Sequence, residues 1–373
     1  MATNSLPSAI GDYEDWPEYV RASAATPASE AAESPLASVL RPPARDADPR
    51  VTFGRERVLD GVRISPLTWQ LGYGPPTAAH FLRPEKSRGP LPAVLLMHCH
   101  SGNKWLGAER LVDLGAEDSP EARALRSSMY EGQAIANLLA ARGFAVLAHD
   151  TFAWGSRRFR LDPTPARTAR HLHGWQARWQ ADGIEATEEM VYNAAAADHE
   201  NTVAKVAGLL GTSFAGMVAH DDLAALDVLR GLPDVDPERI GTLGASGGGG
   251  RAMMLASLSG HVRAHLVCCM MATFDSLLPA YLDGHSWLMY TPGIWALSDW
   301  PLIPLHAPAP QAMHVQFAAH DRLFPLDGMR EADALLQAHR SERLRYSSSW
   351  FDSDHAMTRA MQHEAADFLA ASL

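Results

Sequence analysis

Short, continuous apolar runs alternate with segments of helical periodicity along most of the chain. The runs PAVLLMHC (92–99) and FAVLAHD (144–150) are almost wholly apolar, which is typical of strands buried on both faces of a sheet. Further strand-like runs alternate with helical patterns near 213–230, 247–259, 326–339 and 357–370. This alternation predicts an α/β fold with a mostly parallel central sheet and helices on both faces.

Local signals divide the chain further. Residues 1–50 are rich in Ala, Pro, Ser and acidic residues, so we expect an N-terminal extension that wraps over one domain at 51–373. Residues 156–212 lack strand signals and predict a helical cap insertion, although a plain surface elaboration remains open. A second irregular stretch spans 273–311. A helix is predicted at 128–142, with a capping box of Ser128 and Glu131 at its start.

Composition restricts the class of protein. The 373 residues are 47% hydrophobic and 20% charged, which is ordinary for a globular chain. The net charge of −11 argues against a nucleic-acid partner. Three cysteines without a CxxC pair, no apolar run long enough to span a bilayer and no signal-peptide pattern predict a cytoplasmic protein with no membrane partner. A homo-oligomer is compatible with these features.

The segment Gly244-Ala245-Ser246-Gly247-Gly248 fits the pattern G-x-S-x-G. It follows a predicted strand and precedes a predicted helix, which is the context of a nucleophile elbow. Such a tight turn requires glycines on both sides of the serine. A phosphate-binding loop and a purely structural glycine turn are weaker readings, because the spacing fits neither G-x-G-x-x-G nor a P-loop. Ser246 is therefore the predicted nucleophile.

A serine nucleophile needs a base and an orienting carboxylate. Asp321 follows the predicted strand MHVQFAA, and His355 follows RLRYSSSWF, so both occupy strand ends downstream of Ser246. Asp352 and Asp354 are rival acids in the same short loop as His355. The rival bases fit less well, because they end a helix or lie inside one; they are His339 and His363.

Stabilising an oxyanion requires two backbone N–H donors. Gly247, directly after the nucleophile, is expected to supply one, and the loop His98-Cys99-His100-Ser101-Gly102-Asn103-Lys104 the other. The His98-x-His100 pair could instead indicate metal ligands, but no further ligands stand at supporting spacing. We therefore predict neither a metal nor a cofactor.

These motifs resemble the serine α/β-hydrolases, and several strings are similar to the dienelactone hydrolase and acetylxylan-esterase-like group. The strings are HCHSGNKW, GFAVLAHDTFAWGSR, VDPERIGTLGASGGGGR and HDRLFP. The resemblance covers about residues 60–373 and implies that His100 supplies the second oxyanion N–H. Cys99 and Ser101 replace the glycines of the usual HG-x-G loop. The dienelactone hydrolases proper use Cys where this chain has Ser246, which favours ordinary esters.

Aromatic and polar residues of the irregular stretches are candidates for the substrate pocket. Trp154, Trp287 and Tyr290 are predicted to line it, with core or cap packing as the alternative. Asp150 and Arg157 are expected either to pair at the root of the cap or to remain separate. Four cap residues are polar enough to face the site: Tyr192, Asn193, His199 and Glu200.

The predicted function is hydrolysis of a small-molecule carboxylic ester, with a short acyl group, through an acyl-enzyme on Ser246. Three alternatives stay open. The same triad could transfer the acyl group to another acceptor, or cleave a thioester or C–C bond, and the fold could also carry a catalytically silent binding protein.

Overall fold

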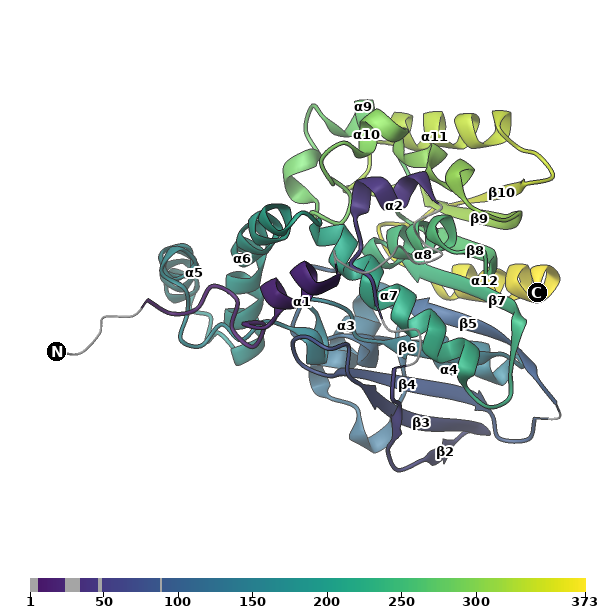
Figure 1. Ribbon diagram of the computed structural model, residues 1–373, viewed down its shortest axis with the longest axis horizontal. Coiled ribbons are helices and arrows are strands. Elements are labelled where there is room, and N and C mark those ends of the chain that lie inside the picture. The colour runs from purple at the N-terminus through teal and green to yellow at the C-terminus, as the bar shows by residue number, and fades with distance from the viewer. Residues whose placement is uncertain (1–5, 24–33, 46–48, 88) are drawn as a thin grey trace.

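The computed structural model describes residues 6–23, 34–45, 49–87 and 89–373. Its centre is a ten-stranded sheet in the order β1-β3-β4-β6-β5-β7-β8-β9-β10, with β2 paired to β3 (Figure 1). The strands are β1 Thr52–Phe53, β2 Arg57–Leu59, β3 Val62–Trp69, β4 Thr77–Pro84, β5 Leu91–Met97, β6 Ala145–His149, β7 Val235–Ala245, β8 Val262–Cys268, β9 Gln311–Ala318 and β10 Leu344–Phe351. The pairs from β6 through β10 are parallel, whereas the β3–β4 and β4–β6 pairs are antiparallel.

Helices cover both faces of this sheet. The helices are α1 Trp16–Ser23, α2 Pro35–Leu40, α3 Pro120–Tyr130, α4 Ile135–Ala141, α5 Ala166–Ala181, α6 Glu188–Leu210, α7 Phe214–Gly231, α8 Gly247–Leu258, α9 Phe274–Leu277, α10 Ile294–Leu297, α11 Leu326–Ala338 and α12 Arg359–Ser372. Helices α7 and α8 pack on one face, and α4 and α12 contact strands on the other. The predicted α/β-hydrolase architecture, a mostly parallel sheet between helices, is confirmed.

Strand β5 explains why the sequence showed an unbroken apolar run. Leu95 and Met97 belong to the core beneath α7 and α8, whereas Val94 and Leu96 belong to the core beneath α4 and α12. Successive side chains of a strand point to opposite faces. Because both faces are covered, neither set can be polar. The parallel strands β5, β7, β8 and β9 end at the same edge of the sheet, and the loops beyond that edge carry the candidate site.

The helix predicted at 128–142 is wrong in its bounds. Helix α3 begins earlier, where the side chain of Ser119 accepts a hydrogen bond from the N–H of Ala122 at 3.1 Å. Ser128 lies inside α3, and Glu131, at φ 49°, ends it in the left-handed region. The capping-box pattern therefore falls at the wrong end of a helix. The second helix, α4, ends just before Gly143 at φ 98°, as expected.

The N-terminal segment contributes to the core as well as wrapping over it. Tyr13, Trp16, Leu36 and Leu40 are fully buried in the core on the α7 and α8 face, where α2 contacts both helices. The prediction that this segment only wraps over the domain is therefore wrong for its described residues, which form part of the core. Residues 24–33 and 46–48 of the segment lie outside the described residues. The domain boundary near residue 51 stays a prediction.

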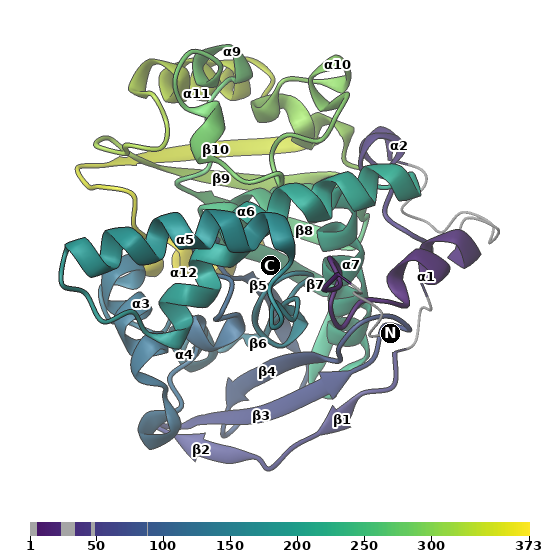
Figure 2. The same cartoon turned by 90° about the vertical axis from the view of Figure 1, so that its left-hand side faces the viewer.

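Two long helices, α5 and α6, lie between β6 and α7, and residues 156–212 carry no strand (Figure 2). They pack against each other, and α6 also contacts α7 and α1. In the described part of the chain, no single helix has both the length and the apolar composition to cross a membrane. The bent pair α6 and α7, which meet at 83°, meets those criteria only jointly.

Candidate active site

Ser246 occupies a sharp turn between β7 and α8. Its backbone, at φ 53° and ψ −130°, lies in a region that costs a non-glycine residue conformational energy. Neighbouring glycines permit the turn. A Cβ on Gly244 would lie 2.3 Å from the Gly248 backbone, and a Cβ on Gly248 would lie 2.3 Å from the Met97 carbonyl oxygen. The local geometry is that of a strand–serine–helix elbow.

Asp321 and His355 come together beyond the ends of β9 and β10. The Asp321 Oδ2 and His355 Nδ1 atoms are 2.6 Å apart, and Oδ1 accepts a hydrogen bond from the Leu323 N–H at 2.8 Å. A carboxylate only accepts, so Nδ1 carries the proton and Nε2 is free to take one. The Asp321 side chain is fully buried, which strengthens the interaction with the imidazole.

The rival residues lie elsewhere. Asp352 is 93% exposed and pairs with His320. The Asp354 carbonyl accepts a hydrogen bond from the Ala356 N–H and shapes the loop before α12. His339 follows α11 and bonds to the Leu335 carbonyl, and His363, within α12, contacts Arg142. Geometry therefore favours Asp321 and His355 over all four.

Ser246 and His355 line one cavity of about 380 Å³. Its wall also includes Gly247 and His100, from the elbow and from the loop after β5. The rest of its lining comes from the loop after β5, from α3, from the irregular stretch 273–311 and from two further positions: Ser101, Gly102, Leu125, Ser128, Met129, Gly284, His285, Ser286, Leu288, Met270 and Leu323. The amphipathic pattern of α3 does not show that this helix packs over the site.

The two predicted oxyanion donors are adjacent. A Cβ placed on Gly247 would lie 3.3 Å from the His100 backbone N, so this N–H and that of Gly247 border the same space. Arg110, fully buried, holds the loop by donating to the Cys99 carbonyl at 2.8 Å and the Asn103 carbonyl at 2.9 Å. Ser101 and Gly102 follow with positive φ, at 50° and 61°. A buried arginine thus fixes a loop that lacks the usual glycines.

A buried ion pair connects this loop to the cap. Lys104 Nζ lies 2.5 Å from Glu200 Oε2, and His100 Nε2 lies 3.5 Å from the same oxygen. Burial alone would raise the pKa of Glu200, but Lys104 and His100 hold it well below its ordinary value. Burial lowers the pKa of Lys104 against the opposing effect of Glu200. Glu200 also accepts hydrogen bonds from Ser286 Oγ at 2.7 Å and the Trp287 N–H at 2.8 Å.

Of the four cap residues predicted to face the site, Glu200 and Asn193 contact its loop. Asn193 Oδ1 accepts from the N–H groups of Lys104 and Trp105, at 2.8 and 3.0 Å. Tyr192 instead donates to the Phe159 carbonyl, and His199 contacts the Ala9 carbonyl. Tyr192 lines a separate cavity of about 600 Å³, whose wall also includes residues 158–162 and Thr164. That cavity is larger than the 380 Å³ cavity, but its described lining includes none of Ser246, Asp321 and His355.

The three aromatic residues predicted to line the pocket have different positions. Trp154 is buried beneath the loop, 5.3 Å from the His100 ring centroid, with Lys104 Nζ 4.6 Å above its own ring. Trp287 is 38% exposed and donates to Asn201. Tyr290 packs near Phe274 and His285. The described lining of the 380 Å³ cavity includes none of the three, so their role in the pocket stays a prediction.

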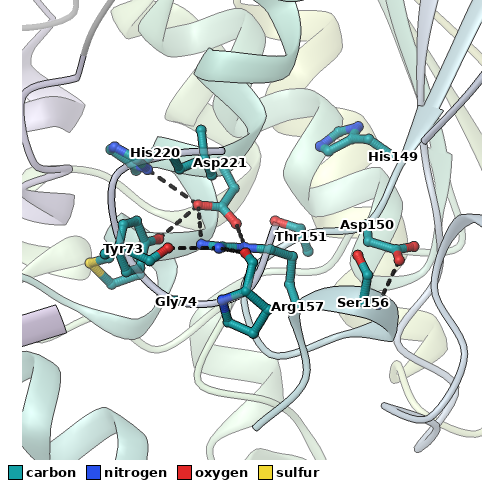
Figure 3. Close-up of polar contacts among 12 residues, drawn as sticks. Tyr73, Gly74, His149, Asp150, Thr151, Ser156, Arg157, His220 and Asp221 are labelled. Atoms are coloured by element: carbon teal, nitrogen blue, oxygen red, sulfur yellow. Dashed lines mark hydrogen bonds and ion pairs between the residues drawn. The ribbon is translucent and has the colours of Figure 1, made fainter. Parts of the chain in front are cut away.

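Asp150 and Arg157 do not pair with each other, and Figure 3 shows their separate polar contacts. Asp150 accepts from the N–H groups of Ala108, at 2.7 Å, and Ser156, at 2.6 Å. Arg157 pairs with Asp221 of α7, 3.1 Å away, and donates to the Tyr73 carbonyl. The alternative of a direct pair is therefore wrong, because each charge is satisfied by a different segment.

His98 and His100 do not converge on a common point. His98 is buried, with Nδ1 3.1 Å from the Cys99 carbonyl, and burial lowers its pKa well below the usual range. The Gly102 N–H donates to His100 Nδ1 at 2.9 Å, which leaves Nε2 protonated and facing Glu200. Neither imidazole is placed to share a metal with the other.

Comparisons with known proteins find similar chains among esterases and a protein named as a hydrolase. A family model of acetyl xylan esterase (AXE1) matches residues 208–274, which contain Ser246. The Bacillus subtilis (strain 168) protein named "Putative hydrolase YtaP" is 28% identical over 296 residues, covering 78% of this chain and 82% of the relative.

Two solved structures share the fold. Acetyl Xylan Esterase 1 from Thermoanaerobacterium sp. JW/SL YS485 has a TM-score of 0.52 and 15% identity, covering 98% of this chain and 96% of that one. A glucuronoyl esterase from Solibacter usitatus has a TM-score of 0.56 and 13% identity, covering 99% and 98%. Together with the family-model match, these likenesses show that the chain has the α/β-hydrolase fold and is similar to the acetyl xylan esterases.

Proposed function

We propose that this enzyme hydrolyses a small carboxylic ester with a short acyl group, through an acyl-enzyme on Ser246. The observation that carries the proposal is the 2.6 Å contact between Asp321 and His355, because His355 lines the same cavity as Ser246. A serine on an elbow, an imidazole with one free nitrogen and a buried carboxylate are the groups that acyl transfer needs.

The first half of the reaction uses each group once. His355 Nε2 takes the proton from Ser246 Oγ as the oxygen attacks the ester carbonyl carbon. The N–H groups of Gly247 and His100 donate to the oxyanion of the tetrahedral intermediate. Protonated His355 then gives its proton to the leaving alkoxide oxygen, and the C–O bond breaks. Asp321 holds the imidazole tautomer and stabilises the imidazolium.

In the second half, water replaces the alcohol. His355 removes a proton from the water as its oxygen attacks the acyl carbon, and the same two N–H groups stabilise the oxyanion. Collapse of the intermediate returns the proton to Ser246 Oγ and releases the carboxylic acid. The enzyme therefore returns to its starting protonation state without a further reactant.

The cavity also bears on the substrate. Among the described residues of its lining there is no Asp, Glu, Lys or Arg, so a charged group next to the ester would be buried without a partner. Met270 and Leu288 form apolar wall, and hydroxyl and imidazole groups come from Ser101, Ser128, His285 and Ser286. A neutral ester with a small acyl group and a hydroxylated alcohol matches this lining. Acetyl esters of sugars are one such class, in line with the name of the matched family.

A fluorophosphonate probe tests the proposal, because it phosphonylates an activated serine. We expect intact mass to increase by one probe per chain, with the adduct on Ser246, and acetyl ester hydrolysis to be lost in parallel. The Ser246→Ala variant should stay unlabelled, and His355→Ala should label far more slowly. An unlabelled wild-type chain, or labelling that persists in Ser246→Ala, would rule out Ser246 as the nucleophile.

A further inference from the structure

A cysteine lies directly behind the Asp321–His355 pair. Potential ligand atoms of Cys269, Asp321 and His355 all lie within 4.8 Å of one another. Cys269 follows the end of β8 with φ 52°, and its N–H donates to the Gln316 carbonyl at 2.9 Å. The Cys269 Sγ lies 3.7 Å from the Ala356 carbonyl oxygen, so the thiol reaches the loop that carries His355. The mechanism above gives this thiol no role.

We propose that Cys269, Asp321 and His355 form an inhibitory binding site for Zn²⁺. Zinc takes thiolate, imidazole and carboxylate ligands at about 2.0–2.3 Å in a tetrahedron, so its ligand atoms are roughly 3.2–3.8 Å apart. Ligand atoms at the 4.8 Å limit would therefore need to approach by about 1.0–1.6 Å, while the 2.6 Å Asp321–His355 contact opens slightly. The site is distinct from a resident catalytic metal, which the serine mechanism does not require.

Charge balance favours a divalent ion at this position. One thiolate and one carboxylate carry a total charge of −2, so bound Zn²⁺ makes the cluster neutral. Cys269 is 4% exposed and Asp321 9% exposed, and a buried site that is neutral overall avoids most of the cost of burying charge. The thiolate ligand selects zinc over magnesium or calcium, which prefer oxygen ligands.

Zinc binding would inhibit turnover by changing which nitrogen of His355 carries the proton. Zinc binding to Cys269 expels the thiol proton to solvent. Zinc binds Nδ1 of His355 through the lone pair of that nitrogen. The proton that Nδ1 carries in the metal-free enzyme therefore moves to Nε2. An imidazole protonated at Nε2 cannot accept the proton of Ser246. Inhibition of turnover rests on the proposed function, whereas metal binding by the three side chains does not.

Access to the site adds a kinetic expectation. The His355 side chain is 14% exposed, whereas the Asp321 carboxylate behind it is fully buried. An ion must therefore pass the imidazole, which has to move before the thiol can bind. We expect inhibition to develop with time.

Spectroscopy of Co²⁺, which takes zinc sites and is coloured, tests binding without any use of activity. A thiolate ligand produces a sulfur-to-cobalt charge-transfer band. We expect the reduced wild-type protein to show this band, Zn²⁺ to abolish it by competition, and Cys269→Ser to lack it. Cys268→Ser is the comparison variant: the Cys268 Sγ lies 3.6 Å from the Cys269 Sγ and 3.8 Å from Met361 Sδ, but it is not one of the three clustered groups. It should keep the band.

Zinc titrations of acetyl ester hydrolysis form the second arm, with each variant compared with its own rate after chelation. The half-inhibitory concentration should rise about 10- to 100-fold in Cys269→Ser relative to both wild type and Cys268→Ser. Circular dichroism checks that each variant is folded, and Cys269→Ala replaces the serine variant if that one is not.

Three outcomes would overturn the site: no cobalt–thiolate band in wild type, a band lost in Cys268→Ser but kept in Cys269→Ser, or equal zinc sensitivity in all variants. A band on Cys269 in a chain that neither turns over esters nor reacts with the phosphonate would keep the metal site and reject the proposed function. An active, probe-labelled enzyme without the band would do the reverse.

Discussion

The Glu200 carboxylate of helix α6 lies 2.5 Å from the Lys104 ammonium, and both side chains are more than nine-tenths buried. Lys104 belongs to the loop whose backbone borders the nucleophile, and Glu200 belongs to the cap. The same carboxylate accepts from Ser286 and Trp287, in a segment that also borders the site. One buried acid therefore fixes the cap, the loop after β5 and the wall of the cavity relative to one another.

We predict that Glu200→Gln impairs both stability and catalysis. Removing one partner leaves the buried Lys104 unpaired, which costs about 3–5 kcal/mol in the free energy of unfolding. Because the His100 N–H is held by the same loop, kcat should fall by about 10- to 100-fold, with a smaller change in KM. Denaturant unfolding and steady-state kinetics measure the two effects.

Asp198→Asn is the matched control for Glu200. Asp198 lies on the same helix but pairs with Arg167, which is 53% exposed. We expect a loss below about 1 kcal/mol and an unchanged kcat, since such partly exposed pairs contribute little. If both variants lose the same stability and activity, the Lys104–Glu200 pair has no special role in positioning the loop.

The depressed pKa of Glu200 predicts an acid-dependent stability. A carboxyl whose folded pKa lies below its unfolded value of 4.5 stabilises the protein above that value, and the contribution is lost as pH falls toward the folded pKa. The wild type should therefore lose its advantage over Glu200→Gln as pH falls below about 4.5, by at most about 1.4 kcal/mol per pH unit. If the difference in the free energy of unfolding between wild type and Glu200→Gln stays constant at all acidic pH values, this linkage is contradicted.

The triad makes a sharper kinetic prediction. Ser246→Ala and His355→Ala should lower kcat by about 10³- to 10⁶-fold while the fold is kept. Asp321→Asn should reduce kcat by about 10⁴-fold, since an amide at that position favours the wrong tautomer of His355. Thermal denaturation checks the fold, and acetyl ester hydrolysis gives the rates.

Asp352→Asn provides the comparison for the acid. Its carboxylate is 93% exposed and pairs with His320 rather than with His355. We expect near-normal turnover in this variant and in Asp354→Asn. If Asp352→Asn or Asp354→Asn loses activity while Asp321→Asn stays active, the residue changed in the inactive variant is the acid that orients His355.

The sequence was enough to predict the positions of side chains that depend on the order of the strands. Ser246, Asp321 and His355 each follow a strand, and parallel strands bring their ends to one edge, so periodicity and chain order predicted their proximity. The bounds of α3 were wrong because Ser128 and Glu131 fit a capping pattern locally, whereas Ser119 makes the N-cap hydrogen bond.

Other features depend on contacts between distant segments. Nothing in the pattern around Arg110 or Lys104 indicates a buried charge, because the partners are carbonyl groups of a folded loop and a carboxylate some hundred residues away. Trp154 was predicted to line the pocket from its type and position. Its burial follows from contacts with His100 and Lys104 of the loop after β5 and with Phe214 of α7, which no local pattern encodes.

Chelation tests whether ester hydrolysis needs a metal. His98 and His100 point to different partners, and the serine mechanism uses only side chains and backbone N–H groups. We predict that exhaustive dialysis against a chelator leaves kcat unchanged or raises it where inhibitory zinc was bound. A loss of activity that zinc restores would contradict both the serine mechanism and the inhibitory site.

The size of the acyl group is the last prediction. The Leu288 Cδ1 lies 3.5 Å from the position that a Cβ on Gly247 would occupy, so this side chain closes the cavity beside the predicted oxyanion site. Overfilling a packed space costs about 1–3 kcal/mol. We therefore expect activity on p-nitrophenyl esters to fall steeply beyond about four acyl carbons, and Leu288→Ala to move that limit to longer chains.

The tryptophans serve as contrasting variants in the same assay. Trp154 contacts the His100 ring and the Lys104 ammonium, so Trp154→Ala should lower kcat for every chain length without shifting the profile. Trp287 is 38% exposed, and its indole donates to Asn201 at the protein surface, so Trp287→Ala should change little. A profile that peaks at eight or more carbons in wild type, or that Leu288→Ala leaves unmoved while Trp154→Ala extends it, would place the acyl pocket on the other side of the loop.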